Sequence, residues 1–410
     1  MMIKSSQALT HGSYIYTLFH GFIVFSIAKH EIIYQAMQYD CSIPKGQESF
    51  VKVFVTGSTG FIGKHLVRRL AADGHAVRCL ARRTSRVQDL QDLGVEIYYG
   101  DVSDPEVLLE GMAGCDCLFH LANLYSMWET DPDVFMRVNL EGTRTVLECA
   151  YKAGMGRVVY VSTVAVYGKP AQVPFDEDCE PGPVLFSDYA RSKAAADRAA
   201  WDFHARMGLP LVVLYPGIVL GAGDDKASGQ YIQGLIRRRL PSTIFHQSKA
   251  TYVYVGDVVE AMLRAAYLPQ AVGQKYLLGR TVLSGREFAE LIRSISGVAL
   301  PLFRFPDWMV TAASYLFTAV SALVRRPPLW GLSIDAAATL RSGFVIDGSK
   351  AARSLGIEYS PIDAALREAI ESYRRQNEPA GSPALILPDR STGPCAPLGI
   401  LDKEMENQDG

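Results

Sequence analysis

The feature that most constrains the fold of this chain is a glycine-rich loop, Thr56-Gly57-Ser58-Thr59-Gly60-Phe61-Ile62-Gly63. The apolar run Val51–Thr56 that leads into it is typical of a strand buried on both faces. The run Gly60–Ala72 that follows has the apolar spacing of a helix. Strand, glycine loop and helix in this order open the unit that binds dinucleotides, so we expect a Rossmann-type fold.

Each glycine of the loop has a separate physical task. Gly57 permits the tight turn after the strand, Gly60 lets the backbone approach a pyrophosphate, and Gly63 lets the helix pack closely on the sheet. The N–H groups at the start of the helix face the anion, and the helix dipole strengthens the attraction. The residues expected to contact the cofactor here are Gly57, Thr59, Gly60, Phe61, Ile62 and Gly63.

Short apolar runs and longer amphipathic runs alternate further along the chain. The predicted strands are Val51–Thr56, Ala76–Ala81, Glu96–Tyr99, Cys115–Ala122, Arg157–Val166 and Leu211–Tyr215, and the predicted helices are Gly60–Ala72, Pro105–Met112, Pro132–Ala153 and Ser187–Met207. This alternation predicts an α/β fold, a doubly wound parallel sheet with helices on both faces. We expect four regions: a poorly defined extension (1–50), the dinucleotide-binding core (51–220), a smaller substrate lobe interleaved with it (221–376) and a disordered tail (377–410).

The end of the second predicted strand distinguishes NAD from NADP. A carboxylate there would bond to the ribose 2′-hydroxyl, whereas an arginine suits a 2′-phosphate. Arg82 and Arg83 follow the strand, with Arg86 nearby and no carboxylate among them. NADP(H) is therefore favoured over NAD(H), with Arg82 as the phosphate contact. After the third strand, the Asp101 side chain and the Val102 N–H are expected to meet the adenine ring.

A tyrosine and a lysine, Tyr189 and Lys193, lie on one face of a predicted helix. A free tyrosine has a pKa of about 10, and a neighbouring ammonium would lower it. Ser162 and Thr163 stand at the end of the fifth predicted strand, where open α/β sheets bind ligands. This set predicts hydride transfer between nicotinamide and a substrate carbon that bears oxygen, with Tyr189 moving the proton.

Together these pieces resemble the extended short-chain dehydrogenase/reductase family over roughly residues 51–375. The matching segments are Thr56–Gly63, Gly100–Val102, His120–Asn123, Val138–Thr143, Val161–Gly168, Tyr189–Lys193 and Tyr215–Gly217. Tyr125-Ser126-Met127-Trp128 points to the dihydroflavonol-reductase-like branch, which includes hopanoid-associated sugar epimerases and relatives of 3β-hydroxysteroid dehydrogenase. The resemblance implies that Thr163 is the catalytic hydroxyl, that Tyr189 is the general acid/base, and that Lys193 tunes it and binds the ribose. It also places Leu121, Ala122, Pro216 and Gly217 around the cofactor.

Two enzymatic interpretations share this machinery. A reductase or dehydrogenase releases a changed cofactor, whereas an epimerase or dehydratase returns the hydride to its substrate. The run Ser248–Tyr252 lacks the Arg-Asp pair that nucleotide-sugar members of the family often carry, which weakens the case for a nucleotide-sugar substrate. The apolar stretch Trp308–Val324 favours an apolar, lipid-like or aromatic alcohol or ketone. A third interpretation is a non-catalytic NADP-sensing module, but the intact set of Thr163, Tyr189 and Lys193 argues against it.

Composition limits the partners. A formal net charge of −2 gives no electrostatic basis for nucleic-acid binding, and no metal site is expected. Seven scattered cysteines favour a reduced, cytoplasmic protein. Two uncharged stretches leave peripheral membrane contact open: Gly12–Ala28 is a weak anchor or an irregular extension, and Trp308–Val324 is a buried helix or a membrane-surface helix. A homodimer through Pro132–Ala153 and Ser187–Met207 also stays open.

Overall fold

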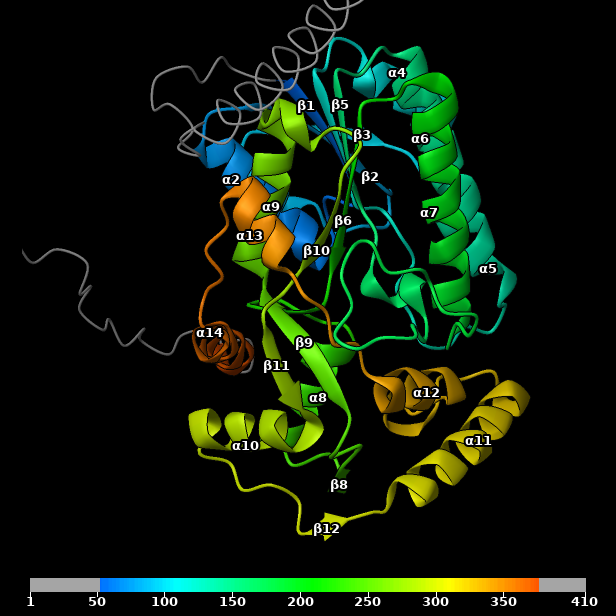
Figure 1. Ribbon diagram of the computed structural model, residues 1–410, viewed down its shortest axis with the longest axis vertical. Coiled ribbons are helices and arrows are strands. Elements are labelled where there is room, and N and C mark those ends of the chain that lie inside the picture. Colours follow the sequence, from blue (N-terminus) through cyan, green and yellow to red (C-terminus); the bar gives the residue numbers. More distant parts are fainter. Residues whose placement is uncertain (1–51, 376–410) are drawn as a thin grey trace, which may run out of the picture.

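A seven-stranded parallel sheet lies at the centre of the molecule, which the computed structural model describes over residues 52–375 (Figure 1). Its order is β10-β6-β5-β4-β1-β2-β3, and every neighbouring pair is parallel. The order reverses between β1 and β4, the position at which open α/β sheets bind ligands. The predicted doubly wound α/β fold is confirmed. The strands are β1 (Lys52–Thr56), β2 (Ala76–Ala81), β3 (Glu96–Tyr99), β4 (Cys117–His120), β5 (Arg157–Val161), β6 (Leu211–Pro216) and β10 (Lys275–Leu278).

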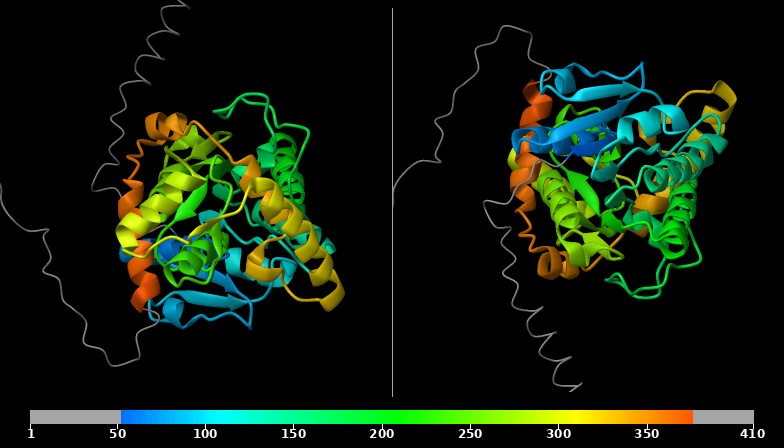
Figure 2. Two further views of the ribbon diagram at one scale, coloured as in Figure 1. Left: turned by 90° about the horizontal axis from the view of Figure 1, so that it is seen from below. Right: turned by 90° about the horizontal axis from the view of Figure 1, so that it is seen from above.

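Helices cover both faces of this sheet, as the views from below and above show (Figure 2). One face carries α2 (Phe61–Ala72), α9 (Val255–Tyr267) and α13 (Ser349–Leu355). The other carries α4 (Pro105–Met112), α6 (Gly142–Lys152) and α7 (Asp188–Met207). Two short helices, α3 (Gln88–Gln91) and α5 (Asp133–Phe135), lie in the connections.

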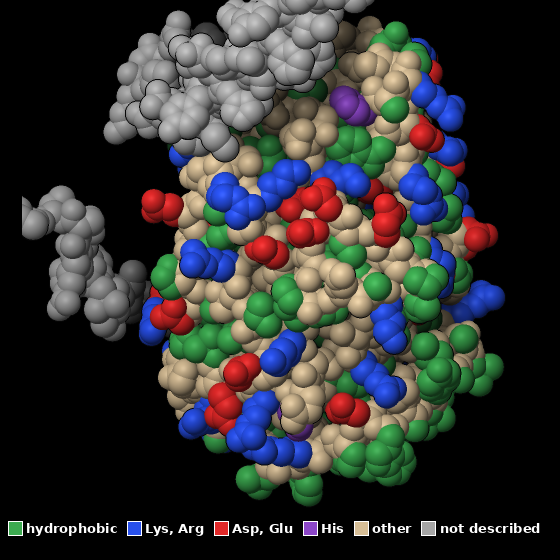
Figure 3. Space-filling model, in the orientation of Figure 1, with side chains coloured by type: hydrophobic (Ala, Val, Ile, Leu, Met, Phe, Trp, Pro, Cys, Tyr) green, Lys and Arg blue, Asp and Glu red, His purple; other side chains and the backbone are tan. Residues whose placement is uncertain are grey.

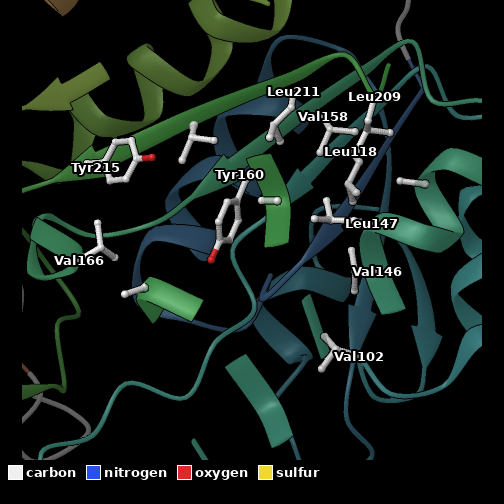
Figure 4. Packing of buried hydrophobic residues seen from close by; sticks show 14 of the residues in the cluster. Val102, Leu118, Val146, Leu147, Val158, Tyr160, Val166, Leu209, Leu211 and Tyr215 are labelled. Carbon is white, nitrogen blue, oxygen red and sulfur yellow. The ribbon is translucent and has the colours of Figure 1, made fainter. Parts of the chain in front are cut away.

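Each face of the sheet has its own apolar core because successive side chains of a strand point to opposite faces. On β1, Val53 and Val55 join the core beneath α2 and α9, whereas Phe54 joins the core beneath α4, α6 and α7. Figure 4 shows part of the second core, where Leu118 and Val158 of the sheet lie close to helix residues such as Val146. Burial on both faces accounts for the nearly continuous apolar runs of the strands.

A smaller lobe lies beyond the carboxyl ends of the strands, in the lower half of Figure 1. Its three-stranded sheet has the order β11-β9-β7, and three helices pack around it. A two-stranded sheet, β12-β8, and two further helices, α11 and α12, complete the lobe. The elements of the lobe are β7 (Ile218–Leu220), α8 (Ala227–Ile236), β8 (Ser242–Thr243), β9 (Lys249–Tyr254), β11 (Thr281–Ser284), α10 (Gly285–Ser296), β12 (Phe303–Arg304), α11 (Asp307–Val324), α12 (Ile334–Ser342) and α14 (Ile362–Arg375).

Two predicted elements differ from the structure. The strand expected over Arg157–Val166 ends at Val161, and Val164–Tyr167 forms a 3₁₀ turn instead. The Thr163 side chain accepts a hydrogen bond from the Ala165 N–H at 3.3 Å, a local bond that competes with strand pairing. The single helix expected over Pro132–Ala153 is divided into α5, a π-helical segment at Met136–Glu141, and α6.

The uncharged stretch Trp308–Val324 forms most of α11, and its interpretation as a buried core helix is wrong. The buried residues of this helix are Val310, Ser314 and Ser321, whereas its large apolar side chains are mostly exposed. Within residues 52–375, α11 is the one helix long and apolar enough to cross a membrane, judged by length and composition. The other uncharged stretch, Gly12–Ala28, lies outside the described residues, as do the predicted extension and tail.

Candidate active site

The glycine loop has the geometry that its sequence predicts. Gly57 has a φ of +74°, which favours glycine, and its carbonyl accepts the Gly60 N–H at 3.0 Å. A Cβ on Gly57 would lie 2.6 Å from the Ala122 nitrogen, and a Cβ on Gly63 would lie 2.1 Å from the Gly57 oxygen. The turn and the close helix contact therefore both require glycine.

The start of α2 is open to an anion. The helix begins at Phe61, and its N-cap residue, Gly60, supplies no side-chain hydrogen bond to the first turn. A Cβ on Gly60 would meet only the Gly57 oxygen, at 3.2 Å, so this side of the loop is not packed against other elements. With no acidic residue in the first turn of α2, backbone N–H groups there fit a pyrophosphate.

The other expected cofactor contacts lie at the carboxyl ends of neighbouring strands. Arg82 directly follows β2 and is exposed. Asp101 follows β3, but its carboxylate accepts hydrogen bonds from the Ser103 N–H and hydroxyl, each at 3.3 Å, so it is partly occupied within its own turn. Val102 is buried, and its side chain is where a Cβ on Gly142 would fall.

The floor of this site is tied to β1. The N–H groups of Leu121 and Ala122 donate to the Thr56 carbonyl at 3.1 Å and to the Thr56 hydroxyl at 3.4 Å. On the far side of the reversal point, Pro216 ends β6 and the Gly217 N–H donates to Leu278 at 2.9 Å. The predicted cofactor residues thus lie along one edge of the sheet.

The helix α7, which carries Tyr189 and Lys193, begins at a side-chain cap. The Ser187 hydroxyl accepts from the Ala190 N–H at 3.0 Å, which places Tyr189 in the first turn and Lys193 one turn later. Tyr189 is 7% exposed, and its phenol lies close enough to the Thr163 hydroxyl for that hydroxyl to lower its pKa. The structure therefore brings together the predicted tyrosine and the predicted strand-end hydroxyl.

An aromatic side chain covers this tyrosine. The Tyr125 ring meets the Tyr189 ring edge to face, with ring centroids 5.0 Å apart. Burial raises the pKa of Tyr189, proximity to Tyr125 raises it further, and the nearby Thr163 hydroxyl opposes both effects. Burial also raises the pKa of Tyr125 to about 12. Both phenols are therefore neutral at physiological pH.

The predicted lowering of the Tyr189 pKa by Lys193 is wrong, because burial dominates at the phenol. The lysine ammonium donates to the Tyr160 hydroxyl at 2.9 Å and to the Val161 carbonyl at 3.1 Å. Burial lowers the pKa of Lys193 to about 7, and the nearby Asp197 carboxylate opposes that shift. Lys193 is thus a buried cation whose charge depends on its immediate partners.

A buried polar network below Lys193 did not emerge from the sequence. His120 lies 2.7 Å from the Thr56 hydroxyl and 3.0 Å from the Thr143 hydroxyl. Its ring stacks on Tyr160 with centroids 5.3 Å apart. Burial lowers the pKa of His120 to about 3, so the ring is neutral at physiological pH. The stacked His120 ring therefore holds the Tyr160 ring in position, and the Tyr160 hydroxyl accepts the hydrogen bond from Lys193.

Asp197 is a second residue that sequence reasoning missed. It accepts a hydrogen bond from the Tyr215 hydroxyl at 3.1 Å, and burial raises its pKa. Its sequence signal was available, because Tyr189, Lys193 and Asp197 stand at successive intervals of four on one helix face. The acid lies where it can balance the buried ammonium.

A cavity of about 580 Å³ lies beside this site. It is bounded by the segment leading into α7, the loop after the 3₁₀ turn, α11 and α12, and Thr163 and Tyr189 are not among its lining residues. Charged side chains are few: Lys169 and Arg341 stand among mainly apolar and small residues. The apolar members of the lining are Pro170, Val173, Phe175, Phe186, Tyr315, Ile334, Ala337, Ala338, Phe344 and Val345.

Known proteins resemble this chain over most of their length. Residues 53–279 match the model of the NAD dependent epimerase/dehydratase family. A protein of Synechocystis sp. assigned as a dihydroflavonol 4-reductase is 32% identical, over 78% of this chain and 94% of its own. The 4-hydroxy-2-methyl-3-oxo-4-farnesyl-3,4-dihydroquinoline-1-oxide ketoreductase of Stigmatella aurantiaca is 31% identical, over 82% and 99%. The solved structure of gox2253 has a TM-score of 0.69 at 28% identity and covers 80% of this chain and 99% of its own.

Proposed function

Since the chain belongs to the NAD-dependent epimerase/dehydratase family, as its resemblance to extended short-chain dehydrogenases predicts, we propose that it is an NADPH-dependent reductase of an apolar ketone. The relatives of this chain include a ketoreductase and UDP-glucose 4-epimerases, and the family model is that of NAD-dependent enzymes. The choice of direction, of cofactor and of substrate class comes from the residues of this chain.

The environment of Tyr189 is the observation that carries the proposal. A phenol with a raised pKa stays protonated, so it is suited to give a proton to an alkoxide as that alkoxide forms. An epimerase cycle begins with the opposite step, in which a base takes a proton from an alcohol. Because burial and Tyr125 both hold Tyr189 in its neutral form, reduction is favoured.

The catalytic step follows from two hydroxyl groups. When bound, the reduced nicotinamide supplies the hydride. The Thr163 hydroxyl and the neighbouring Tyr189 phenol hold the carbonyl oxygen of the substrate. Tyr189 then donates its Oη proton to that oxygen. Lys193, held by Tyr160 and Val161 one helical turn after Tyr189, would bind the nicotinamide ribose.

The cofactor preference rests on Arg82. The side chain is exposed at the end of β2 and takes part in none of the ion pairs within residues 52–375, so it is free to bind a 2′-phosphate. The neighbouring Arg83 lies over the Tyr99 ring at 5.7 Å, which leaves Arg82 as the better-placed cation.

The substrate class rests on the apolar surroundings. The Tyr125 ring covers Tyr189, the proposed proton donor, and the adjacent cavity is lined mainly by apolar groups. The relative from Stigmatella aurantiaca is named for reduction of a farnesyl-bearing ketone, which agrees with an apolar substrate.

A cofactor assay with a substrate panel tests the proposal. The full chain is given NADPH and apolar ketones, and loss of reduced-nicotinamide absorbance is expected. Tyr189→Phe should abolish turnover, whereas Tyr151→Phe, an exposed tyrosine on α6, should leave it unchanged. Isomerisation of a nucleotide sugar with no net absorbance change would establish an epimerase instead. Tight NADPH binding without turnover of any compound would favour the sensing module.

A further inference from the structure

The helix α11 is inverted relative to an ordinary surface helix of a soluble protein. Apart from Val310, its inward stripe is small and polar: Ser314 and Ser321 are buried, and Thr318 accepts a hydrogen bond from the Ile334 N–H at 3.0 Å. Its outward stripe is large and apolar, with Trp308 70% exposed and Leu323 85% exposed. A surface helix in water normally buries its apolar side chains and exposes its polar ones. The outward face of α11 is therefore suited to an apolar environment.

The exposed apolar surface extends beyond α11. Within residues 52–375, thirteen of the twenty-two exposed large apolar side chains fall between residues 302 and 340. In Figure 3 they gather at the lower right, over α11, and at the lower end, over β12. We call this set the apolar rim: Leu302, Phe303, Phe305, Trp308, Met309, Tyr315, Leu316, Val320, Leu323, Val324, Leu329, Trp330 and Leu340.

Cations flank this rim. Arg304 separates two exposed phenylalanines, and Arg325 and Arg326 follow the last turn of α11, all three being exposed. The acidic residue of the helix, Asp307, lies in its first turn at the opposite end. Indole and phenol rings beside arginines are the combination that binds at the headgroup level of a bilayer, and arginines add attraction to anionic lipids.

The helix is placed to lie along a membrane rather than to span it. Its inward hydroxyls are bonded within the protein, as Thr318 is to α12 and Ser314 is to the Thr311 carbonyl at 2.7 Å. Spanning would separate α11 from α12 and expose these groups to hydrocarbon. Lying flat buries only the outward stripe.

We propose that the apolar rim docks this protein on an anionic lipid bilayer, with α11 in the plane of the interface. Tyr315 links the rim to the cavity, because it is 59% exposed and also lines the cavity beside α7. A lipid-like molecule in the bilayer would therefore have a short apolar path from the apolar rim to the cavity. The docking itself does not depend on the proposed reductase activity, and its test measures binding rather than turnover.

Tryptophan quenching by brominated lipids tests the contact locally. The chain has four tryptophans, all within the described residues: Trp308 and Trp330 lie in the apolar rim, and Trp128 and Trp201 lie elsewhere. Vesicles of phosphatidylglycerol and brominated phosphatidylcholine should quench the fluorescence of the full chain. The W308F/W330F variant should lose most of that quenching, and W128F should keep it. Equal quenching of all three proteins, or no quenching, would overturn the proposal.

Vesicle co-sedimentation tests the energetics. The variant W308S/L316Q/L323Q should bind anionic vesicles more than about tenfold more weakly. The matched variant Y151S/M207Q, which removes exposed apolar groups at the far ends of α6 and α7, should bind like the wild type. R325Q/R326Q should weaken binding to anionic vesicles but not to neutral ones. If the rim variant instead converts a soluble dimer to a monomer and vesicle binding is unchanged, a second copy covers the rim and the proposal is wrong.

Discussion

Acid should destabilise this protein through one buried histidine. His120 is enclosed between the Thr56 and Thr143 hydroxyls and the Tyr160 ring, and its pKa is lowered to about 3. In the unfolded chain the same imidazole has a pKa of about 6.5. Between these two values the unfolded state binds a proton that the folded state excludes. The contribution of His120 to the free energy of unfolding is therefore lost as the pH falls from about 6.5 towards 3.

The magnitude follows from the width of that window. Each pH unit within it is worth about 1.4 kcal/mol, so lowering the pH from 7.5 to about 4.5 should cost between about 2 and 3 kcal/mol at this residue. Other buried acids, such as Asp197 and Glu177, titrate as well. A reference variant, His120→Gln, removes the imidazole and leaves those groups in place.

Urea unfolding at the two pH values measures the effect. The free energy of unfolding of the wild type should fall by between about 2 and 3 kcal/mol more than that of His120→Gln. The variant has a constant cost from its lost ring, which cancels in this difference. If both proteins lose the same free energy between pH 7.5 and about 4.5, His120 is not held neutral in the fold and the described network is wrong.

Four substitutions test the site itself. Tyr189→Phe should lower kcat by about a hundredfold to ten-thousandfold while NADPH affinity changes little; retained turnover would exclude Tyr189 as the proton donor. Arg82→Glu should weaken NADPH binding at least about tenfold and NADH binding much less, and equal losses would mean that Arg82 does not contact the 2′-phosphate. Gly63→Ala places a Cβ 2.1 Å from the loop carbonyl, so thermal unfolding should occur at a lower temperature and the cofactor Kd should rise; unchanged values would show that the helix is free to shift. Asp197→Asn removes the group that raises the pKa of Lys193, so the fall of kcat/KM with rising pH should begin about one to two units lower; an unmoved profile would separate Asp197 from the lysine.

The sequence was most informative where a local pattern and the fold agreed. The glycine loop, the strand-end hydroxyl Thr163 and the four-residue spacing of Tyr189 and Lys193 each have a local physical reason, and the structure brings them to one edge of the sheet. The end of β5 was misjudged because Val164, Ala165 and Val166 continue an apolar run that suits a strand, whereas the Thr163 side chain turns the chain there.

The network at His120 depends on register, which a single sequence does not contain. Thr56 pairs with His120 across β1 and β4, and His120 pairs with Tyr160 across β4 and β5. These three residues are more than a hundred positions apart at the extremes, and only the alignment of three parallel strands places them in one row. The orientation of α11 could not be predicted from the sequence for a similar reason. An apolar stretch predicts removal from water, but it does not tell whether the protein core or another apolar environment covers it.

The row of residues across the sheet means that Lys193 and the walls of the cavity are held by different parts of the structure. Lys193 is bonded to two residues of β5, Tyr160 and Val161, in the parallel sheet that forms the central layer of the molecule. Tyr125 and the walls of the cavity come from loops, α11 and α12, none of which belongs to that layer. Substitutions in the loops, α11 and α12 can therefore adapt the cavity to a new substrate, or adapt the outer surface to a new partner. The sheet keeps Lys193 in its position meanwhile. A chemistry shared by many relatives and a substrate peculiar to each are what such a division of parts would produce.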